Sequence, residues 1–443
     1  MIRKYLILTA IVSLVGPISP ALAEVPNPIT EAAYAPVNLA EAELGQLLFW
    51  DPILSGNRNI SCATCHHPRF ASGDGVALSL GEGGIGLGPD RKPDPTNQPE
   101  QRIPRNAPAL FNLGAHEFTA LFHDGRIETD PKRLSGMRTP LDDDMLQGFA
   151  SVLSAQTMFP VLSSDEMAGH YSENDVSAAV RRGVITGDGG AWDIIAQRVV
   201  EIETYRKSFV AVYPEIAAGR RVAFTDISNA IAAFVAFEWR SDGSRFDAHL
   251  RGAAPLTGDA LAGFELFYGA AGCSFCHAGP FQTDHRYHAM GVPQIGPGKA
   301  ARFENHARDT GRIGVTGQVG DAYAFRTPSL RNVLATSPYG HDGAYSDLRG
   351  FLNAHIDPAN AISTYERNQV LLPELPGAQD WRALDDPAET LAIVQAITLN
   401  PVGLSEIEVA AISAFLQSLS DDTALSGRLG IPTSVPSGLQ IDR

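Results

Sequence analysis

The sequence predicts a mainly α-helical protein built from two similar halves, with long loops and little β-structure. Apolar residues recur at helical spacing in segments spread along the 443-residue chain. Runs that alternate Val, Ile or Thr with polar residues, the pattern typical of strands, are scarce. A weak internal repeat relates the first half to the second. At roughly 100–200 residues per domain, the chain has room for two or three domains.

Eight segments have the helical spacing, and we predict a helix in each. They are residues 39–49, 176–182, 191–202, 225–239, 258–268, 347–355, 388–398 and 405–419. Thr225 and Ser405 are suited to cap two of these helices, and Glu408 gives Ser405 a capping box. The boundary between domains is expected within residues 241–257. The Gly-, Ser- and Pro-containing tail over residues 421–443 is expected to be irregular.

Composition excludes several classes of protein. Hydrophobic residues make up 44% of the chain and charged residues 19%, which excludes an intrinsically disordered protein. The formal net charge of −16 argues against binding to nucleic acid or to an anionic membrane face. It leaves a basic protein partner open. No apolar run after the N-terminal segment approaches the length of a membrane helix.

The first 23 residues have the features of a secretory signal peptide. Arg3 and Lys4 precede an apolar stretch over residues 5–15, which is too short to span a bilayer comfortably. An A-x-A site over residues 21–23 precedes Glu24. We therefore predict cleavage after Ala23 and a periplasmic protein without a membrane span. An N-terminal membrane anchor is the alternative, which the small-residue site disfavours.

All the cysteines of the chain lie in two copies of one motif, C-x-x-C-H. An exported chain normally pairs an even set of cysteines in disulfides. This spacing instead is the attachment signature of c-type haem, in which two thiols one helical turn apart add to the vinyl groups of one porphyrin and the adjacent His ligates the iron. A redox C-x-x-C needs no following His, and a zinc site would gather its four ligands. We predict two covalent haems on Cys62, Cys65, His66, Cys273, Cys276 and His277.

The two motifs lie far apart, so the sequence predicts one haem per domain, with an N-terminal domain over residues 24–245 and a C-terminal domain over residues 246–420. After the first motif the chain reads R-N-A-P-A-L-F-N from Arg105 and H-D-G from His123. After the second it reads R-T-P-S-L-R-N from Arg326 and H-D-G from His341. Pro and Asn are four residues apart in both segments. An old duplication of a one-haem domain explains this pattern.

These segments, together with L-G-Q-L-L-F-W-D-P-I-L-S-G before Cys62 and S-P-Y-G-H-D-G before Ala344, resemble the bacterial dihaem cytochrome c peroxidase family. That family includes the methylamine-utilisation dihaem enzyme, which oxidises tryptophans of a partner protein. The resemblance covers nearly all of the chain after the signal peptide. It implies two cytochrome c-like haem domains, with peroxide reacting at the N-terminal haem and electrons relayed by the C-terminal haem.

The resemblance also implies a set of catalytic residues near the N-terminal haem. The family carries a Gln, a Pro and a Glu in the pattern Q-x-x-x-P-x-x-x-x-x-E-M, which Gln156, Pro160 and Glu166 match here. A carboxylate can move a proton from one peroxide oxygen to the other while the amide holds the departing oxygen. The alternative is that Gln156 and Glu166 belong to a solvated loop.

Some family members block the reactive haem with a distal His from the loop after the first C-x-x-C-H, and these enzymes must be reduced before that His leaves. This chain has no His between His67 and His116. His67 is adjacent to the proximal ligand and cannot reach the opposite face. We expect the reactive haem to be open without prior reduction.

The second haem departs from the family pattern. Its sixth ligand is usually Met, or Tyr in the methylamine-utilisation enzyme, but no Met follows Met290 here. The family spacing from the T-x-P at residues 336–338 leads to His355 as the axial ligand. Met290, Tyr339 and Tyr345 are the rival ligands, and an ordinary surface His is the alternative for His355. A bis-His haem would have a lower potential than a His/Met haem.

Two further assignments follow from the resemblance. His123 stands where the family usually has a Trp that bridges the haems electronically, so its role between the haems is open. The family also holds a calcium ion between the domains, which maps onto the side chain of Asn106 and the main-chain oxygens of Thr336 and Pro338. The alternative for Asn106 is a turn cap.

Three functions are compatible with these features. The first is an exported peroxidase that reduces hydrogen peroxide with electrons from a small cytochrome c or copper protein. The second is an oxidase that modifies aromatic residues of a protein substrate. The third is a dihaem electron carrier without catalysis, which would need no acid–base pair such as Gln156 and Glu166. A homodimer is compatible with each of them.

Overall fold

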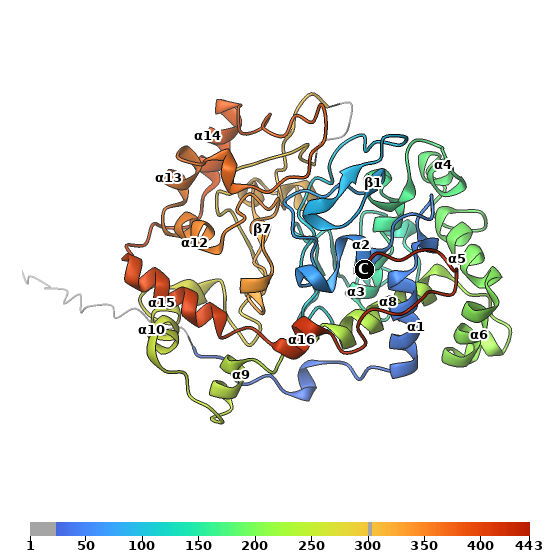
Figure 1. Cartoon of the computed structure of the whole chain (residues 1–443), viewed down its shortest axis with the longest axis horizontal. Helices are drawn as coiled ribbons and strands as arrows, with labels where there is room; N and C mark the ends of the chain where they lie inside the picture. Colours follow the sequence, from blue (N-terminus) through green and yellow to red (C-terminus); the bar gives the residue numbers. More distant parts are fainter. Residues whose placement is uncertain (1–23, 300–303) are drawn as a thin grey trace, which may run out of the picture.

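The computed structural model describes residues 24–299 and 304–443, so the predicted signal peptide lies outside the described residues. The described chain is mainly α-helical, as predicted, and its strands are only two or three residues long. None of the described helices is both long and apolar enough to cross a membrane. Helices α1 to α8 and α9 to α15 occupy opposite sides of the molecule (Figure 1).

Each of the eight predicted helices is confirmed, with ends within two residues of the predicted ones. In chain order the helices are α1 (Leu39–Trp50), α2 (Cys62–Cys65), α3 (Val152–Thr157), α4 (Asp175–Arg181), α5 (Ala191–Glu201), α6 (Glu203–Val212), α7 (Pro214–Ala217), α8 (Phe224–Glu238), α9 (Arg245–Leu250), α10 (Gly258–Phe267), α11 (Ile313–Thr316), α12 (Leu348–Ile356), α13 (Pro358–Ser363), α14 (Pro387–Ala396), α15 (Glu406–Gln417) and α16 (Asp422–Ser426).

The strands form three small antiparallel sheets. They are β1 (Gly84–Ile85) with β2 (Lys92–Pro93), then β3 (Ala120–Leu121), β4 (Ile127–Thr129) and β5 (Met137–Arg138) in that order, and finally β6 (Tyr287–His288) with β7 (Phe325–Arg326).

Each half of the chain is organised around one close crossing of two helices. Helix α1 packs against α8, and helix α10 packs against α15. A Cβ on Gly45 of α1 would overlap the carbonyl oxygen of Ala230, and one on Gly263 of α10 would overlap that of Ala411. Glycine therefore lets the helix backbones touch at matching places in the two halves. In both cases the first helix precedes a C-x-x-C-H motif.

We expect Gly263→Ala to lower the free energy of unfolding by about 1–3 kcal/mol, because the added methyl group has no room at the α10–α15 crossing. Chemical denaturation followed by far-UV circular dichroism measures this change. Gly403→Ala is the control, since a Cβ there has open space. Equal stability of the two variants would contradict the close crossing.

The two halves meet at Ser241, between α8 and α9. The amide nitrogen of Asn112 donates to the carbonyl oxygen of Ser241 (2.9 Å), and that of Asn332 donates to its hydroxyl (3.1 Å). Both asparagines have left-handed backbone, with φ of 61° and 62°. They are the last residues of the two repeated segments that begin at Arg105 and Arg326. The sequence repeat therefore has a structural counterpart at this junction.

The buried apolar side chains form two large clusters. One is built by residues 29–239 together with Phe281, and the other by residues 246–419, so the chain mostly changes cluster just before α9. The C-terminal segment is an exception, because Ala424 and Val435 return to the first cluster. In Figure 1 this dark red segment runs from α16 back across the side that holds α1 and α8.

The two predicted helix caps and the predicted irregular tail differ in outcome. Ser405 caps α15 with Glu408 in a capping box, as predicted. The prediction for Thr225 is wrong, because α8 begins one residue earlier and Ala223 occupies the cap position, where its N–H donates to Asp226. The tail over residues 421–443 begins with α16 rather than with irregular chain, because the Asp421 carboxylate accepts from the first N–H groups of that helix.

Candidate functional site

The first C-x-x-C-H motif forms one helical turn followed by a fixed imidazole. Helix α2 carries Cys62 and Cys65 at its two ends, and the hydroxyl of Thr64 accepts from the N–H of Ser61 (3.1 Å). His66 follows the helix, and its Nδ1 lies 2.9 Å from the carbonyl oxygen of Ser72. Because a carbonyl only accepts, Nδ1 carries the proton. The Nε2 lone pair of His66 is therefore available to a metal.

The second motif is built in the same way. A short 3₁₀ turn holds Cys273–Phe275, and Nδ1 of His277 lies 3.1 Å from the carbonyl oxygen of Gln282. The carbonyls of Pro108 and Pro328, at matching places of the repeat, raise the pKa of His66 and His277 respectively. Burial outweighs this effect and lowers both pKa values, to about 4 for His277. Both imidazoles are thus neutral ligands at neutral pH.

All four cysteines are free thiols. Burial raises the pKa of Cys62 and Cys65 to about 12 and that of Cys273 to about 11, and it also raises the pKa of Cys276. Free thiols are the groups that add to the two vinyl substituents of a porphyrin. The donor set of each motif therefore fits one c-type haem.

The residues predicted to act on peroxide occupy consecutive turns after β5. Gln156 lies in α3, Pro160 starts the 3₁₀ turn Pro160–Leu162, and Glu166 lies in the single π-turn Ser164–Ala168. The side-chain oxygen of Gln156 is buried and accepts no hydrogen bond from the described residues. Glu166 is close enough to Cys65 to raise the pKa of that thiol. The neighbouring carbonyl of Asp165 accepts from the N–H of Glu82 (2.9 Å), in the loop whose Ser79 hydroxyl lies 3.8 Å from the Cys65 sulfur, so the turn that holds Glu166 is near the first motif.

Two opposing effects set the pKa of Glu166. Burial raises it, while the positive charges of Lys299 and Arg126 lower it, and burial prevails. Lys299 and Arg126 also line a polar cavity of about 660 Å³ at the junction of the two halves, which we call the seam cavity. The seam cavity is thus bordered by two of the residues whose charges act on Glu166.

His67 is held on the side of the first motif's own helix. Its Nδ1 accepts from the N–H of Arg69 (3.1 Å), and its ring lies edge-on to Trp50 at 5.3 Å between centroids. This position agrees with the expectation that His67 does not block the first iron site.

The structure brings His355 to His277. The two ring centroids are 6.5 Å apart with an interplanar angle of 49°. His355 lies at the end of α12, and its Nδ1 donates to the carbonyl oxygen of Phe351 (2.8 Å), which leaves Nε2 free. An imidazole nitrogen binds a metal at about 2 Å, so two imidazoles on opposite sides of one ion have ring centroids about 6 Å apart. The observed spacing has room for one ion.

The rival ligands are less well placed. The Tyr339 hydroxyl donates to the carbonyl oxygen of Val333 (3.0 Å) and is committed there. The Tyr345 hydroxyl is buried without a partner among the described residues, but its ring lies against Phe351 and Tyr365. Met290 is a partly buried member of the second cluster. Among these candidates, His355 is the one whose ring contacts that of His277 within the described chain.

His123 lies at the junction of the two halves. Its carbonyl accepts from the N–H of Arg326 (2.7 Å), and its Nε2 lies 3.2 Å from the carbonyl oxygen of Asn106. Burial and the charges of Arg105 and Arg326 lower its pKa to about 4. His123 is therefore a neutral, buried imidazole between the two halves, in the region where the resemblance implies a bridging residue.

The residues predicted to hold calcium lie around Ala77. The amide nitrogen of Asn106 donates to the carbonyls of Val76 (2.9 Å) and Ala77 (3.3 Å), while no described donor bonds its side-chain oxygen. Gly343 packs against both Ala77 and the ring of Pro338. Asn106 and Pro338 thus lie near one another beside Ala77, and the main-chain oxygen of Thr336 stays a predicted ligand. An amide oxygen with main-chain carbonyls is a donor set suited to a hard cation.

One residue of this region was not predicted. Arg326 is half-buried, its guanidinium makes only two long contacts (3.4 Å) to the carbonyls of Phe122 and Thr327, and partial burial lowers its pKa. No carboxylate within the described ranges pairs with it. A half-buried cation without an anion fits a haem propionate, and the position of Arg326 at the head of the second repeated segment was the signal that could have identified it.

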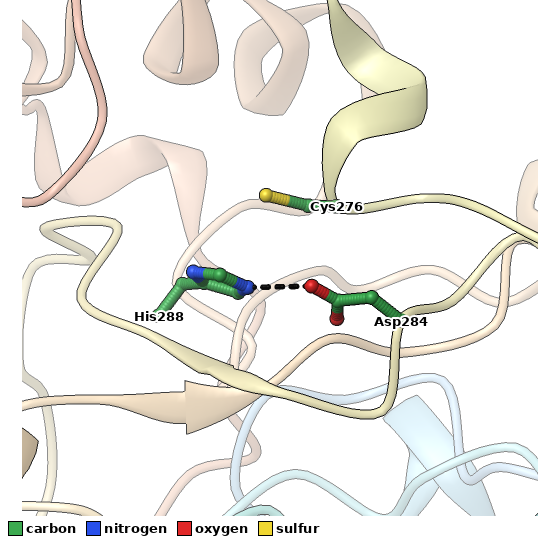
Figure 2. Close-up of side chains that lie close together, drawn as sticks. All are labelled: Cys276, Asp284 and His288. Atoms are coloured by element: carbon green, nitrogen blue, oxygen red, sulfur yellow. Dashed lines mark hydrogen bonds and ion pairs between the residues drawn. The ribbon is translucent and has the colours of Figure 1, made fainter. Parts of the chain in front are cut away.

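A further cluster lies beside the second motif. Cys276, Asp284 and His288 have ligand-type atoms within 4.8 Å of one another, and the His288 ring bonds Asp284 at 2.8 Å (Figure 2). The Cys276 sulfur belongs to the haem-attachment motif, and a thioether sulfur does not offer a thiolate to a metal. The remaining His–carboxylate pair is too few ligands for a metal site.

Comparison with known proteins decides the family. The model of the family described as di-haem cytochrome c peroxidase matches residues 39–255. The cytochrome c551 peroxidase of Nitrosomonas europaea is 30% identical over 71% of this chain and 72% of its own length. This chain belongs to the di-haem cytochrome c peroxidase family. As a member of that family, it is an oxidoreductase of the peroxidase type, and the family is one with two c-type haems.

Other members of the di-haem cytochrome c peroxidase family resemble the chain over more of its length. The methylamine utilization protein MauG of Paracoccus denitrificans is 27% identical over 91% of this chain and 94% of its own. Among solved structures, a MauG-like protein associated with microbial copper homeostasis aligns with a TM-score of 0.56 and 25% identity, over 93% of this chain and 97% of that protein.

Proposed function

We propose that the protein is an exported dihaem peroxidase. It reduces hydrogen peroxide at the haem held by His66 and draws electrons through the haem held by His277 and His355. The observation that carries this proposal is the difference between the two sites. His277 has a second imidazole opposite it at 6.5 Å between ring centroids. His66 has no such ring contact among the described residues, and the polar turn Ser164–Ala168, which carries Glu166, lies near the first motif instead.

Each half of the chain provides one c-haem domain in this scheme, over residues 24–245 and 246–420. The two helix crossings at Gly45 and Gly263 and the matched imidazole–carbonyl bonds of His66 and His277 support this division. The junction holds calcium on Asn106, Thr336 and Pro338, and His123 lies between the haems. The homodimer stays a prediction.

A haem held by His66 would supply the redox chemistry that cleaves the O–O bond. The protein's own residues handle the protons. Glu166 takes the proton from the oxygen nearer the iron and delivers it to the outer oxygen, which leaves as water. The Gln156 amide holds that departing oxygen. Two electrons and two further protons complete the reduction of one hydrogen peroxide to two molecules of water.

The electrons come from a small redox protein, either a cytochrome c or a copper protein. The net charge of −16 favours a donor with a basic surface, because opposite charges steer association. The donor would meet a haem held by His277 and His355, and two imidazole ligands there would leave no position for peroxide. The predicted signal peptide over residues 1–23 is the basis for a periplasmic location.

We expect the fully ferric protein to react with peroxide without prior reduction, because His67 is committed to Arg69 and Trp50 and no other His lies in that loop. Stopped-flow absorbance after mixing with one equivalent of peroxide measures the reaction. The control is the pyridine haemochrome of the denatured protein, which should give two haems per chain. A ferric protein that is inert, and reacts only after one-electron reduction, would contradict the open site.

A second candidate is an oxidase that modifies aromatic residues of a partner protein. The coverage of the MauG alignment, 91% of this chain and 94% of the relative, favours it. The absence of the bridging Trp at the position of His123 disfavours it. Steady-state assays separate the two functions. Rapid turnover of peroxide with a reduced cytochrome c supports the peroxidase, whereas peroxide-dependent change in the mass of a co-purifying protein supports the oxidase.

A further inference from the structure

The last 17 residues of the chain, 427–443, extend from the C-terminal side of the molecule back over the N-terminal half. We call this segment the strap. It follows α16 and has no regular secondary structure, yet Val435 is buried and Leu439 and Ile441 pack against the first hydrophobic cluster. In Figure 1 the strap crosses the side that holds α1 and α8, and the C-terminus lies in front of α2.

The start of the strap is fixed to the end of α8. The buried carboxylate of Glu238 accepts from three consecutive backbone N–H groups, those of Arg428 (2.9 Å), Leu429 (2.6 Å) and Gly430 (3.0 Å). Gly427 has a left-handed backbone, with φ of 76°, and a Cβ there would overlap the Glu238 carboxylate. The amide of Gln46 in α1 donates to the carbonyl of Gly430 (2.8 Å) from the other side.

The middle of the strap is fixed to the end of α1. The hydroxyl and N–H of Ser437 donate to the carboxylate of Asp51 (2.6 and 3.3 Å). Asp51 is fully buried and also accepts from the Tyr205 hydroxyl (2.7 Å). A buried carboxylate needs such donors, so the strap completes the hydrogen bonding of a charge inside the first half.

The end of the strap reaches the first haem-attachment turn itself. The Thr64 hydroxyl, which lies between Cys62 and Cys65, donates to the Asp442 carboxylate at 2.8 Å. Burial lowers the pKa of His67, the residue after His66, and the nearby Asp442 charge opposes that effect. The side chain of Thr64 is thereby enclosed, and the residue is only 2% exposed.

The second attachment turn has no such cover. Phe275 is the residue that matches Thr64 in the second C-x-x-C-H motif, and it is 67% exposed. Its neighbour Ser274 is 3% exposed, like the matching Ala63 at 0%, so the two turns are buried alike on their inner side. The difference between the turns is therefore on their outer side, where one carries the strap and the other carries an exposed aromatic ring.

We propose that the strap is the element that decides which haem exchanges electrons with external donors. By covering the outer side of α2, it keeps donors away from the attachment edge of the first haem, so that donors meet the edge at Phe275 instead. Electron tunnelling falls steeply with distance, so one added layer of chain is enough to suppress direct transfer. The inference rests on the proposed peroxidase function, in which two electrons must reach the first haem through the second.

The test uses variants that release the end of the strap, and it measures how fast a small electron donor is oxidised. Ferrocyanide is the probe, since two ferrocyanide ions become two ferricyanide ions as one peroxide and two protons become two waters. We expect Asp442→Ala to raise the second-order rate constant for ferrocyanide about tenfold or more, the change expected in the population of the opened strap when one charge-assisted hydrogen bond is lost. A chain that ends at Gly430 should show a larger rise. Asp422→Ala, an exposed acid of α16, is the control and should leave the rate constant unchanged.

Three measurements keep the outcome decisive. Pyridine haemochrome must give two haems per chain in each variant, and a variant that loses the first haem would overturn the inference by making the strap an attachment device. Hydrogen exchange must show that residues 431–443 are released. Release without a rise in the ferrocyanide rate constant would also overturn it. If no variant reacts with peroxide, the proposed function fails, and the strap is then judged by whether dithionite reduces the first haem faster in the released variants.

Discussion

We expect Glu166→Gln to lower the rate of peroxide cleavage by ~10²–10⁴-fold, the usual loss when a positioned acid–base group is removed. The turn that holds this carboxylate lies near the first C-x-x-C-H motif, and burial raises the pKa of Glu166. The amide of Gln keeps the shape of the side chain but cannot carry a proton between the two oxygens. Stopped-flow absorbance of the ferric protein after mixing with peroxide measures the change.

Asp165→Asn is the matched control for this variant. Asp165 is the adjacent acid of the same π-turn, and burial raises its pKa as well, but its carboxylate accepts from the Gln101 amide at 2.7 Å. We expect this control to keep peroxide cleavage close to the wild-type rate, with both haems bound. If the two variants lose activity to the same extent, the effect belongs to the turn as a whole. A wild-type rate in Glu166→Gln would move the catalytic acid elsewhere.

The helical framework and the haem-attachment residues could be predicted because their signals are local. The apolar spacing of residues 39–49 or 405–419 is decided within one helix, and each C-x-x-C-H motif is contained in five residues. The single capping error, at Thr225, shows the limit of such signals. The Asp226 carboxylate accepts from the N–H of Ala223, and α8 begins before the expected cap. The position of the helix start therefore depended on whether the side chain of Thr225 or that of Asp226 bonds the backbone.

The strap could not be predicted for the opposite reason. Its anchors Glu238, Asp51 and Thr64 lie about 190 to 390 residues away in the sequence and in the other half of the chain. The composition of the tail predicts irregular chain, and the strap after α16 is irregular. Composition does not indicate where in the fold the strap lies. The half-buried Arg326 is similar, since only the fold reveals that no described carboxylate reaches it.

The ligand of the second haem was the least local of the sequence predictions, because it depended on family spacing across the T-x-P segment and α12. Met290, Tyr339 and Tyr345 were open alternatives. The contact between the rings of His277 and His355, with both Nδ1 atoms bonded to carbonyls, favours His355. Burial lowers the pKa of His355, so this imidazole is also in the neutral form that binds a metal.

If His355 ligates the second iron, the ferric protein has one low-spin bis-imidazole haem and one high-spin or water-bound haem. We expect His355→Ala to remove the low-spin signal and to open the second iron to added cyanide or imidazole. His355→Met should keep six-coordination and raise the potential of that haem, because a thioether favours the ferrous state more than an imidazole does. Electron paramagnetic resonance and magnetic circular dichroism identify the spin states, and a redox titration gives the potential.

Tyr345→Phe is the matched control, because this buried hydroxyl has no partner in the described chain and its ring also lies against Phe351. We expect the control to keep the low-spin signal unchanged. Loss of that signal in Tyr345→Phe, with His355→Ala unaffected, would assign the ligand to the phenol. An unchanged signal in both variants would leave Met290 or Tyr339, and the low potential expected for the relay haem would then have no basis, since it depends on two imidazoles on one iron.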